Sequence, residues 1–330
     1  MPYVELSPSD ARECRALAEA RWSAMLAAKP NLHPAVALQR RLLDVVLDTN
    51  EALGSGRAPR LSLPPRYVTT KLAGGIPALA GEPIQPPIAL LQPALIALVG
   101  ALAEGGGGEA TRSIRSAIDG GRLDLATLLT LALRREQGLL RAFATKAGPG
   151  HDLLWLVCDL ATAPFAHALL QTVFGSAQPG SPLRQALDTW THGYCPLCGS
   201  WPAYAEHAGD SAVRTQNAEA RTEPPPLTAC SWRRLRCSFC AATWELAEGS
   251  CVYCATAADR TNTLVPDAAR PHRQIQSCGA CRGYIKILDE PESLPFPLLA
   301  IADLDSMDLD LLAMQHGAAR PAIRSFKTRR

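Results

Sequence analysis

Eight of the eleven cysteines in this chain of 330 residues form four Cys-x-x-Cys pairs, and all four pairs lie after residue 190. The pairs are Cys195/Cys198, Cys237/Cys240, Cys251/Cys254 and Cys278/Cys281. A Cys-x-x-Cys turn directs two thiolates toward one point, and two such turns supply the four sulfurs of a tetrahedral metal site. The sequence therefore predicts two complete metal sites with no ligand left over.

Sequential pairing of the turns is the simplest arrangement of these ligands. It places Cys195, Cys198, Cys237 and Cys240 in a first site, and Cys251, Cys254, Cys278 and Cys281 in a second. Each site then encloses a strand hairpin, whereas an interleaved arrangement would require crossed connections, which folds avoid. We therefore expect two consecutive small modules with one site each.

Thiolate sulfur in tetrahedral geometry suits zinc or a single iron, and the sequence leaves this choice open. Cys195-Pro-Leu-Cys-Gly199 is a rubredoxin-type turn, in which the glycine lets backbone N–H groups approach a sulfur. The other three pairs are followed by Ala241, Ala255 and Arg282, so they lack this feature. Both sites can be structural, in place of a hydrophobic core, or can take part in redox chemistry or partner contact.

Composition and charge describe an ordinary globular protein. Hydrophobic residues make up 47% of the chain and charged residues 19%, with a formal net charge of +2. Residues 1–10 lack a basic region followed by an apolar stretch, so we expect no signal peptide and a reducing compartment for the thiols. Ile84 to Ala103 carries no charge, but Pro86, Pro87 and Pro93 interrupt it, which favours a buried core helix over a membrane span.

The elements that must position the cysteines divide the chain into four parts. We expect a helical domain over 1–190, a first rubredoxin-like module over 191–248, a second over 249–290, and a C-terminal helix with a basic tail over 291–330. Each module follows the order turn, strand, loop, strand, turn, strand. The fold class is thus α+β, with a helical N-terminal domain followed by two tandem rubredoxin-like or zinc-ribbon modules and a short C-terminal helix.

Several runs of this chain together resemble one family, the formate dehydrogenase accessory (formation) proteins called FdhE. The runs are Cys195-Pro-Leu-Cys-Gly-Ser-Trp-Pro202, Leu235-Arg-Cys-Ser-Phe-Cys-Ala-Ala-Thr-Trp244, Cys251-Val-Tyr-Cys254, Cys278-Gly-Ala-Cys-Arg-Gly-Tyr-Ile-Lys286 and the acidic segment 302–312. Their order and spacing agree with the family over residues 195–312, while the helical first half carries no comparable motif.

The resemblance implies a cytoplasmic, non-catalytic assembly factor that binds the catalytic subunit of a formate dehydrogenase before its export. It implies two rubredoxin-like sites, whose metal is reported as iron that zinc easily replaces, with the eight paired cysteines as ligands. A homodimer is left open. The chain shows no Gly-rich phosphate loop, Gly-x-Ser-x-Gly elbow or His-Glu-x-x-His motif, so no enzymatic activity is expected.

Two alternatives start from the metal modules themselves. The first is a nucleic-acid-binding zinc ribbon, for which Arg233, Arg234 and Arg236 form the only basic cluster. A denser basic stripe would be needed, so no nucleic acid is expected as a partner. The second alternative is a rubredoxin-like electron-transfer protein with iron in both sites, which does not exclude an assembly role.

Several single residues carry further expectations. Trp244 should pack over the first site. Tyr284 and Lys286 should share one side of a short strand at a solvated sheet edge, because strand side chains alternate. A solvated helix face is expected for the acidic residues near the end of the chain, with binding of a basic signal peptide as the alternative. These residues are Asp303, Asp305, Asp308 and Asp310. Residues 318–330 are expected to be disordered.

Overall fold

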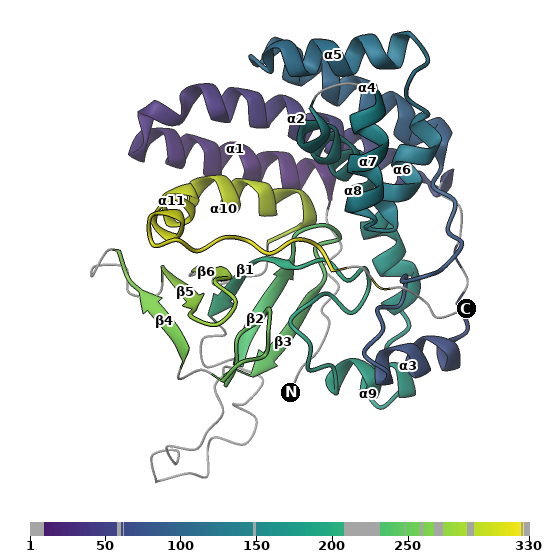
Figure 1. The fold of residues 1–330 in the computed structure, drawn as a ribbon. Coiled ribbons are helices and arrows are strands. Elements are labelled where there is room, and N and C mark those ends of the chain that lie inside the picture. The colour runs from purple at the N-terminus through teal and green to yellow at the C-terminus, as the bar shows by residue number, and fades with distance from the viewer. Residues whose placement is uncertain are drawn as a thin grey trace.

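The computed structural model divides the molecule into a helical half and a sheet-containing half (Figure 1). The structure describes residues 10–57, 61, 63–147, 150–207, 232–247, 249–257, 260–266, 273–288, 294–324 and 326. Pro224 to Pro226 and Cys230, which the sequence places in the loop of the first module, lie outside these residues. The helical N-terminal region, the strands that carry the cysteines and the C-terminal helices occur in the predicted order, which confirms the fold class.

Nine α-helices precede the first strand in the described part of the chain. They are α1 (Ala11–Ala28), α2 (His33–Ala52), α3 (Pro65–Ala73), α4 (Ile88–Glu104), α5 (Gly108–Asp119), α6 (Leu125–Leu133), α7 (Gln137–Ala147), α8 (His151–Phe174) and α9 (Pro182–Asp188). A 3₁₀ turn (Pro30–Leu32) precedes α2, and a π-helical turn (Leu53–Arg57) follows it. Asp10 caps α1 by accepting hydrogen bonds from two N–H groups of the first turn.

Helix α8 forms the centre of the helical half and contacts α2, α4, α5, α6 and α7. It is continuous through Pro164, although a proline inside a helix removes a backbone hydrogen bond and usually bends or breaks the helix. By length and composition α8 could cross a bilayer, but 67% of its most apolar stretch is buried in the protein, and buried core helices pass the same test. Helix α4 is likewise a core helix, in which Leu91, Leu95 and Leu98 are fully buried.

Six strands form one sheet in the order β3-β2-β1-β6-β5-β4. Their bounds are β1 (Pro202–His207), β2 (Trp232–Cys237), β3 (Thr243–Ala247), β4 (Thr261–Leu264), β5 (Gln274–Cys278) and β6 (Tyr284–Leu288). Neighbours are antiparallel except β1 and β6, which pair in parallel. The first three strands and the last three therefore form two antiparallel units of the predicted order, joined into one sheet by the β1–β6 pair.

The C-terminal helices α10 (Leu299–Asp305) and α11 (Met307–Gln315) follow a 3₁₀ turn (Phe296–Leu298) and lie between the sheet and α1. The expected exposure of Lys286 is wrong, because β6 is an inner strand and Lys286 is fully buried. Its ammonium group lies 2.6 Å from an Asp303 carboxylate oxygen and 2.8 Å from Asp310 Oδ2. The Tyr284 hydroxyl also donates to Asp310, so Tyr284 and Lys286 do share one side of the strand.

The expected solvated acidic face is confirmed in part, because Asp305 and Asp308 are exposed whereas Asp303 and Asp310 are half-buried, and all four carboxylates form ion pairs. Asp303 and Asp310 form ion pairs with Lys286, and Asp308 pairs with Arg273. Asp305 pairs with Lys29 at the end of α1. These carboxylates therefore attach the C-terminal helices to the sheet and to α1.

The basic cluster of the sequence lies within the sheet. Arg234 and Arg236 both pair with Glu206 of β1, which is fully buried. Arg233 donates to Gln276 of the second unit and, at 2.9 Å, to the carbonyl oxygen of Ser250. These arginines connect elements of the sheet, which argues against the nucleic-acid-binding alternative.

Candidate metal centres

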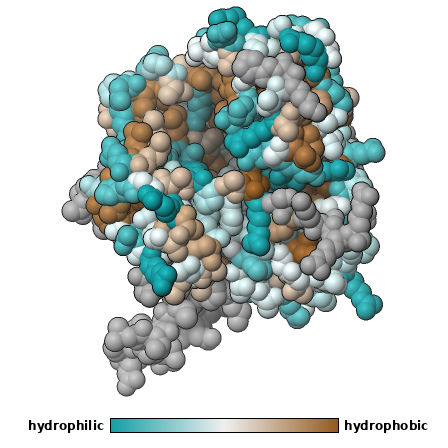
Figure 2. Space-filling model, in the orientation of Figure 1, coloured by the Kyte–Doolittle hydropathy of each residue, from teal (hydrophilic) through white to brown (hydrophobic). Residues whose placement is uncertain are grey.

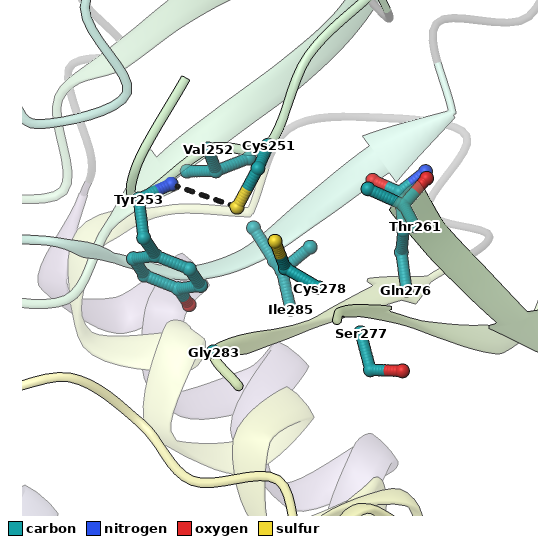
Figure 3. A pocket seen from close by; sticks show the side chains of 9 residues that line it. All are labelled: Cys251, Val252, Tyr253, Thr261, Gln276, Ser277, Cys278, Gly283 and Ile285. Atoms are coloured by element: carbon teal, nitrogen blue, oxygen red, sulfur yellow. Dashed lines mark hydrogen bonds between the residues drawn. The ribbon is translucent and has the colours of Figure 1, made fainter. Parts of the chain in front are cut away.

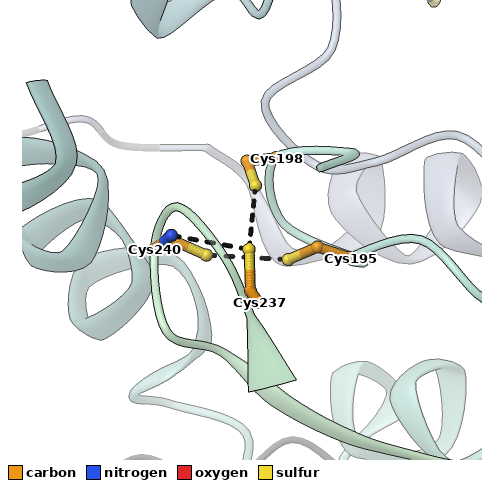
Figure 4. A group of neighbouring side chains, drawn as sticks. All are labelled: Cys195, Cys198, Cys237 and Cys240. Carbon is orange, nitrogen blue, oxygen red and sulfur yellow. Dashed lines mark hydrogen bonds between the residues drawn. The ribbon is translucent and has the colours of Figure 1, made fainter. Parts of the chain in front are cut away.

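The first centre brings together four sulfurs from the two turns that flank the β1–β2 hairpin, which lie at one end of the first antiparallel unit because Pro202 pairs with Cys237. Cys195 and Cys198 precede β1, Cys237 ends β2, and Cys240 lies in the turn before β3. The Cys195 and Cys240 sulfurs are 3.6 Å apart, and those of Cys198 and Cys237 are 3.5 Å apart. All four sulfurs lie within 4.8 Å of one another and point toward one centre (Figure 4).

The second centre repeats this arrangement in the second unit. Cys251 and Cys254 precede β4, Cys278 ends β5, and Cys281 lies in the turn before β6. The Cys251–Cys281 sulfur distance is 3.8 Å and the Cys254–Cys278 distance is 3.7 Å. The sulfurs of Cys251 and Cys278 point toward each other beside Tyr253 (Figure 3). The structure thus groups all eight cysteines in sequence order.

These spacings fit a four-coordinate metal ion. Metal–thiolate bonds of about 2.3 Å give a regular tetrahedron with sulfur–sulfur edges of about 3.8 Å. The four distances above, 3.5–3.8 Å, match that edge. A disulfide would bring two sulfurs to about 2.05 Å, and all the described cysteines are free. Each group can therefore hold one metal ion, and its thiolate donors suit zinc and iron alike.

All four Cys-x-x-Cys turns share one backbone conformation. The residue after the second cysteine is left-handed in each, with φ of 78° at Gly199, 60° at Ala241, 58° at Ala255 and 58° at Arg282. The N–H of the first cysteine donates to the carbonyl five residues later in every turn, at 2.8–2.9 Å. The three turns without glycine thus match the rubredoxin-type turn, although the left-handed conformation costs a residue with a Cβ about 1–2 kcal/mol.

Backbone N–H groups approach the sulfurs in both centres. The amides of Phe239 and Cys240 donate to Cys237 Sγ at 3.4 and 3.5 Å. In the second centre the Tyr253 amide donates to Cys251 Sγ, and the Gly283 amide to Cys281 Sγ, both at 3.4 Å. Such donors favour the charged thiolate, which is the form that binds metal.

Burial distinguishes the two centres. Cys195, Cys198, Cys237 and Cys240 are all buried, whereas Cys254 and Cys281 of the second centre are exposed. The backbone N–H groups of Ala78 and Leu79 donate to two carbonyl oxygens of the first turn at 2.8 and 2.9 Å, so this segment lies along that turn. The first centre is thus enclosed by the helical half, and the second lies near the surface.

Charged and polar groups of the helical half surround the first centre. Arg135 forms a buried ion pair with Asp159 of α8, and its guanidinium carbon lies 3.8 Å from the centroid of the Phe239 ring. Burial raises the pKa of Asp159, and Arg135 opposes that shift. His167 Nδ1 lies 3.0 Å from the Cys240 carbonyl oxygen, to which it donates. Burial lowers the pKa of His167, which favours the neutral ring.

The four thiols of the second centre influence one another's ionisation. Despite partial burial, hydrogen bonding with Thr256 lowers the pKa of Cys254 to about 6. Burial and the neighbouring sulfurs raise the pKa of Cys281 to about 12. Such a cluster loses its first proton readily and resists losing more, because the negative charges repel one another. A divalent cation removes that repulsion, so the electrostatics favour metal binding.

The segment that leads into the first turn also contacts the second centre. A Cβ on Gly193 would lie 1.8 Å from the Val252 carbonyl oxygen, so only glycine allows this approach. The Trp244 indole is fully buried and donates to the His192 carbonyl at 3.1 Å. Trp201, just after the first turn, packs edge-on against Tyr253 at 5.0 Å. Sequence reasoning missed this contact between the modules, although the aromatic residues beside both turns are its visible signal.

Curated relatives of this chain are FdhE proteins. The FdhE homolog of Aquifex aeolicus is 30% identical over 131 residues, which are 39% of this chain and 40% of that protein. The FdhE homolog of Yersinia enterocolitica is 29% identical over 166 residues, 50% of this chain and 47% of that protein. The chain therefore matches less than half the length of either relative. No family model matches the chain.

A solved structure extends the comparison to the whole fold. The FdhE protein from Pseudomonas aeruginosa superimposes with a TM-score of 0.58 over 98% of both chains, at 18% identity. The fold alone follows from this likeness, and it includes the helical half, where the sequence carried no motif. In sequence the chain is similar to curated FdhE proteins over 39% to 50% of its length, and in fold it is similar to an FdhE protein over 98% of its length.

Proposed function

We propose that this protein is a cytoplasmic accessory protein that assists the assembly of a formate dehydrogenase. In this role it binds the catalytic subunit of that enzyme before export and performs no catalysis itself. Two centres of four cysteines each on an FdhE fold are the observation that carries the proposal. The curated FdhE relatives support the choice of enzyme through the family resemblance.

The eight paired cysteines would hold two metal ions, which would crosslink the two antiparallel units and, as iron, would supply a one-electron couple. The backbone N–H groups that donate hydrogen bonds to the sulfurs of Cys237, Cys251 and Cys281 would stabilise the thiolates. The helical half encloses the first centre, so a partner that touches a metal centre directly would reach the second.

The test combines metal analysis with capture of the client. The protein is purified from its host without oxygen, and its metal content, visible spectrum and bound proteins are measured. Two irons per chain with a formate dehydrogenase catalytic subunit in the eluate would support the proposal. Two zincs and no such subunit would oppose it. Cys14→Ala is a matched control, because this buried cysteine lies outside both centres.

An electron-transfer function is a second candidate, favoured by the exposure of Cys254 and Cys281. Exposed sulfur ligands shorten the path from an iron centre to a redox partner. Reversible oxidation at a measured potential, with loss of the second centre's couple in Cys254→Ser but not in Cys14→Ala, would support it. A redox-silent protein that still restores formate dehydrogenase in a deletion strain would exclude it.

A further inference from the structure

The chain after α11 is an extended segment that passes over both metal centres. Figure 1 shows it in yellow, running from α11 across the face of the molecule. We name residues 318–326 the C-terminal strap, of which all but residue 325 are described. The sequence predicted disorder for 318–330, and this is wrong for the described part of the strap.

At the second centre the strap contacts the turn that contains Cys281. The Ala319 N–H donates to the Arg282 carbonyl at 2.9 Å, and Ala319 forms a parallel bridge with Gly283. Arg282 Nε donates to the Gly317 carbonyl at 3.1 Å. The strap is thus held by its backbone beside the last metal-binding turn, as an added peptide strand would be.

At the first centre the strap is held by aromatic contacts. The Trp201 indole donates to the Ala322 carbonyl at 2.9 Å. The Phe326 ring lies 4.9 Å from Tyr194, and a Cβ on Gly199 would lie 2.4 Å from its edge. Arg324 lies over Tyr194 at 5.2 Å. Arg324 also lines a pocket of about 260 Å³ that reaches Cys254, so the strap forms part of the wall beside the second centre.

Ion pairs also hold the strap beside the C-terminal helices. Arg320 lies 2.9 Å from Asp303 and 3.0 Å from Asp310, which also hold the buried Lys286. Two carboxylates face two cations while the strap is in place. Removal of Arg320 would leave a net negative charge that favours another cation.

The strap has little buried surface of its own. Its described residues after Ala318 are all exposed or half-buried, whereas every residue of β6 is buried. The surface of this face mixes hydrophilic and apolar residues, as Figure 2 shows. A segment held by a few hydrogen bonds, ring contacts and one surface arginine opens at lower cost than the core does.

We propose that the C-terminal strap is a displaceable occupant of a peptide-binding groove beside the two metal centres. The partner that this groove fits is an extended peptide segment with two arginines four residues apart and an aromatic residue shortly after the second, as in Arg320, Arg324 and Phe326. Displacement of the strap exposes Tyr194 and Trp201 and opens the pocket beside Cys254. The inference goes beyond the proposed function and does not depend on which enzyme is the client.

The test uses the chain's own segment as the probe. A fluorescent synthetic peptide with the sequence of residues 318–330 is titrated into the full metal-loaded chain and into the double variant Arg320→Ala, Phe326→Ala. The double variant should bind the peptide about tenfold more tightly than the unaltered chain, because its own strap competes less. A scrambled peptide of equal charge should not bind. Arg115→Ala with Leu139→Ala, two exposed changes on α5 and α7, is the matched control and should behave like the unaltered chain.

Equal binding of the peptide to all three proteins, or equal binding of the scrambled peptide, would overturn the proposal. Hydrogen exchange of the unaltered chain gives an independent measurement. The Ala319 amide should exchange faster than the amides of β6, and faster still when the peptide is added. Exchange of Ala319 together with β6 would show that the strap is a fixed part of the fold, and would also overturn the proposal.

Discussion

The two metal centres use the same turn but differ in their surroundings. Each centre takes one Cys-x-x-Cys turn before a hairpin and one after it, with sulfur distances between 3.5 and 3.8 Å. The helical half packs around the first centre through Ala78, Arg135 and His167, whereas the second centre is followed by β4, an edge strand with exposed residues. Local sequence thus determines the geometry of ligation, and tertiary packing determines access. We expect the first centre to be mainly structural and the second to exchange its metal and meet partners.

Removal of cysteine pairs should give the largest difference between the centres. Cys195→Ala with Cys198→Ala, and separately Cys251→Ala with Cys254→Ala, should each lose one metal and retain the other. The first variant should lose more than about 4 kcal/mol of unfolding free energy, because its centre is part of the buried core. The second should keep its helical half folded. Metal analysis and thermal melts followed by circular dichroism measure both effects. Loss of both metals in either variant would indicate a shared site.

The loop that covers the first centre depends on one buried lysine. Lys71 Nζ donates to the Ala78 carbonyl at 2.8 Å, to the Ala80 carbonyl at 2.6 Å and to Glu82 at 2.6 Å. Lys71→Met should destabilise the protein by about 3–5 kcal/mol, because the buried Glu82 carboxylate loses its cation and keeps the Tyr67 hydroxyl as a donor. It should also speed the release of metal from the first centre to a chelator. The double variant Lys71→Met, Glu82→Gln should recover part of the stability. A Lys71→Met protein with unchanged melting would contradict this role.

Exposure should decide which metal leaves the unaltered protein first. With a colorimetric chelator in excess, release should occur in two phases, and the second centre should empty about tenfold faster than the first, a difference of about 1.4 kcal/mol in barrier. The variant that lacks Cys251 and Cys254 should show the slow phase alone. A single phase with two metals released together would refute the difference in access.

Features that depend on residues close together in the chain were predicted correctly from the sequence. The cysteine spacing was sufficient for both centres and for the sequence of turns and strands in each unit, but not for the parallel β1–β6 pair that joins the two units into one sheet. Lys286 was predicted to be exposed because its partners Asp303 and Asp310 come later and belong to other elements. The strap was predicted to be disordered because it is basic and short, while the indole that binds it, Trp201, lies 121 residues away from Ala322. Composition cannot reveal such distant pairings, which explains why these two expectations were wrong.

Acid should affect the first centre through His167. Burial lowers the pKa of this side chain below its usual 6.5, so the folded protein keeps the ring neutral while the unfolded chain takes up a proton. Stability should therefore fall as the pH drops below about 6.5. His167→Gln, which keeps a donor near the Cys240 carbonyl, should show a flatter dependence of Tm on pH in this range. Parallel curves for the two proteins would show that His167 does not contribute.

The smallest expected difference between the centres is in unfolding free energy, and it comes from a single methyl group in the Cys-x-x-Cys turn. Ala255 adopts a φ of 58° after the second cysteine of its turn, which favours glycine. Ala255→Gly should relieve this strain and raise the unfolding free energy by about 0.5–1 kcal/mol, after allowance for the greater freedom of glycine in the unfolded chain. The reverse change, Gly199→Ala, should destabilise the protein, because φ is 78° there and the new methyl group would meet the Phe326 ring at 2.4 Å. Denaturant midpoints measure both changes. If the two substitutions shift the midpoint in the same direction, the shared left-handed turn does not govern stability at the two centres.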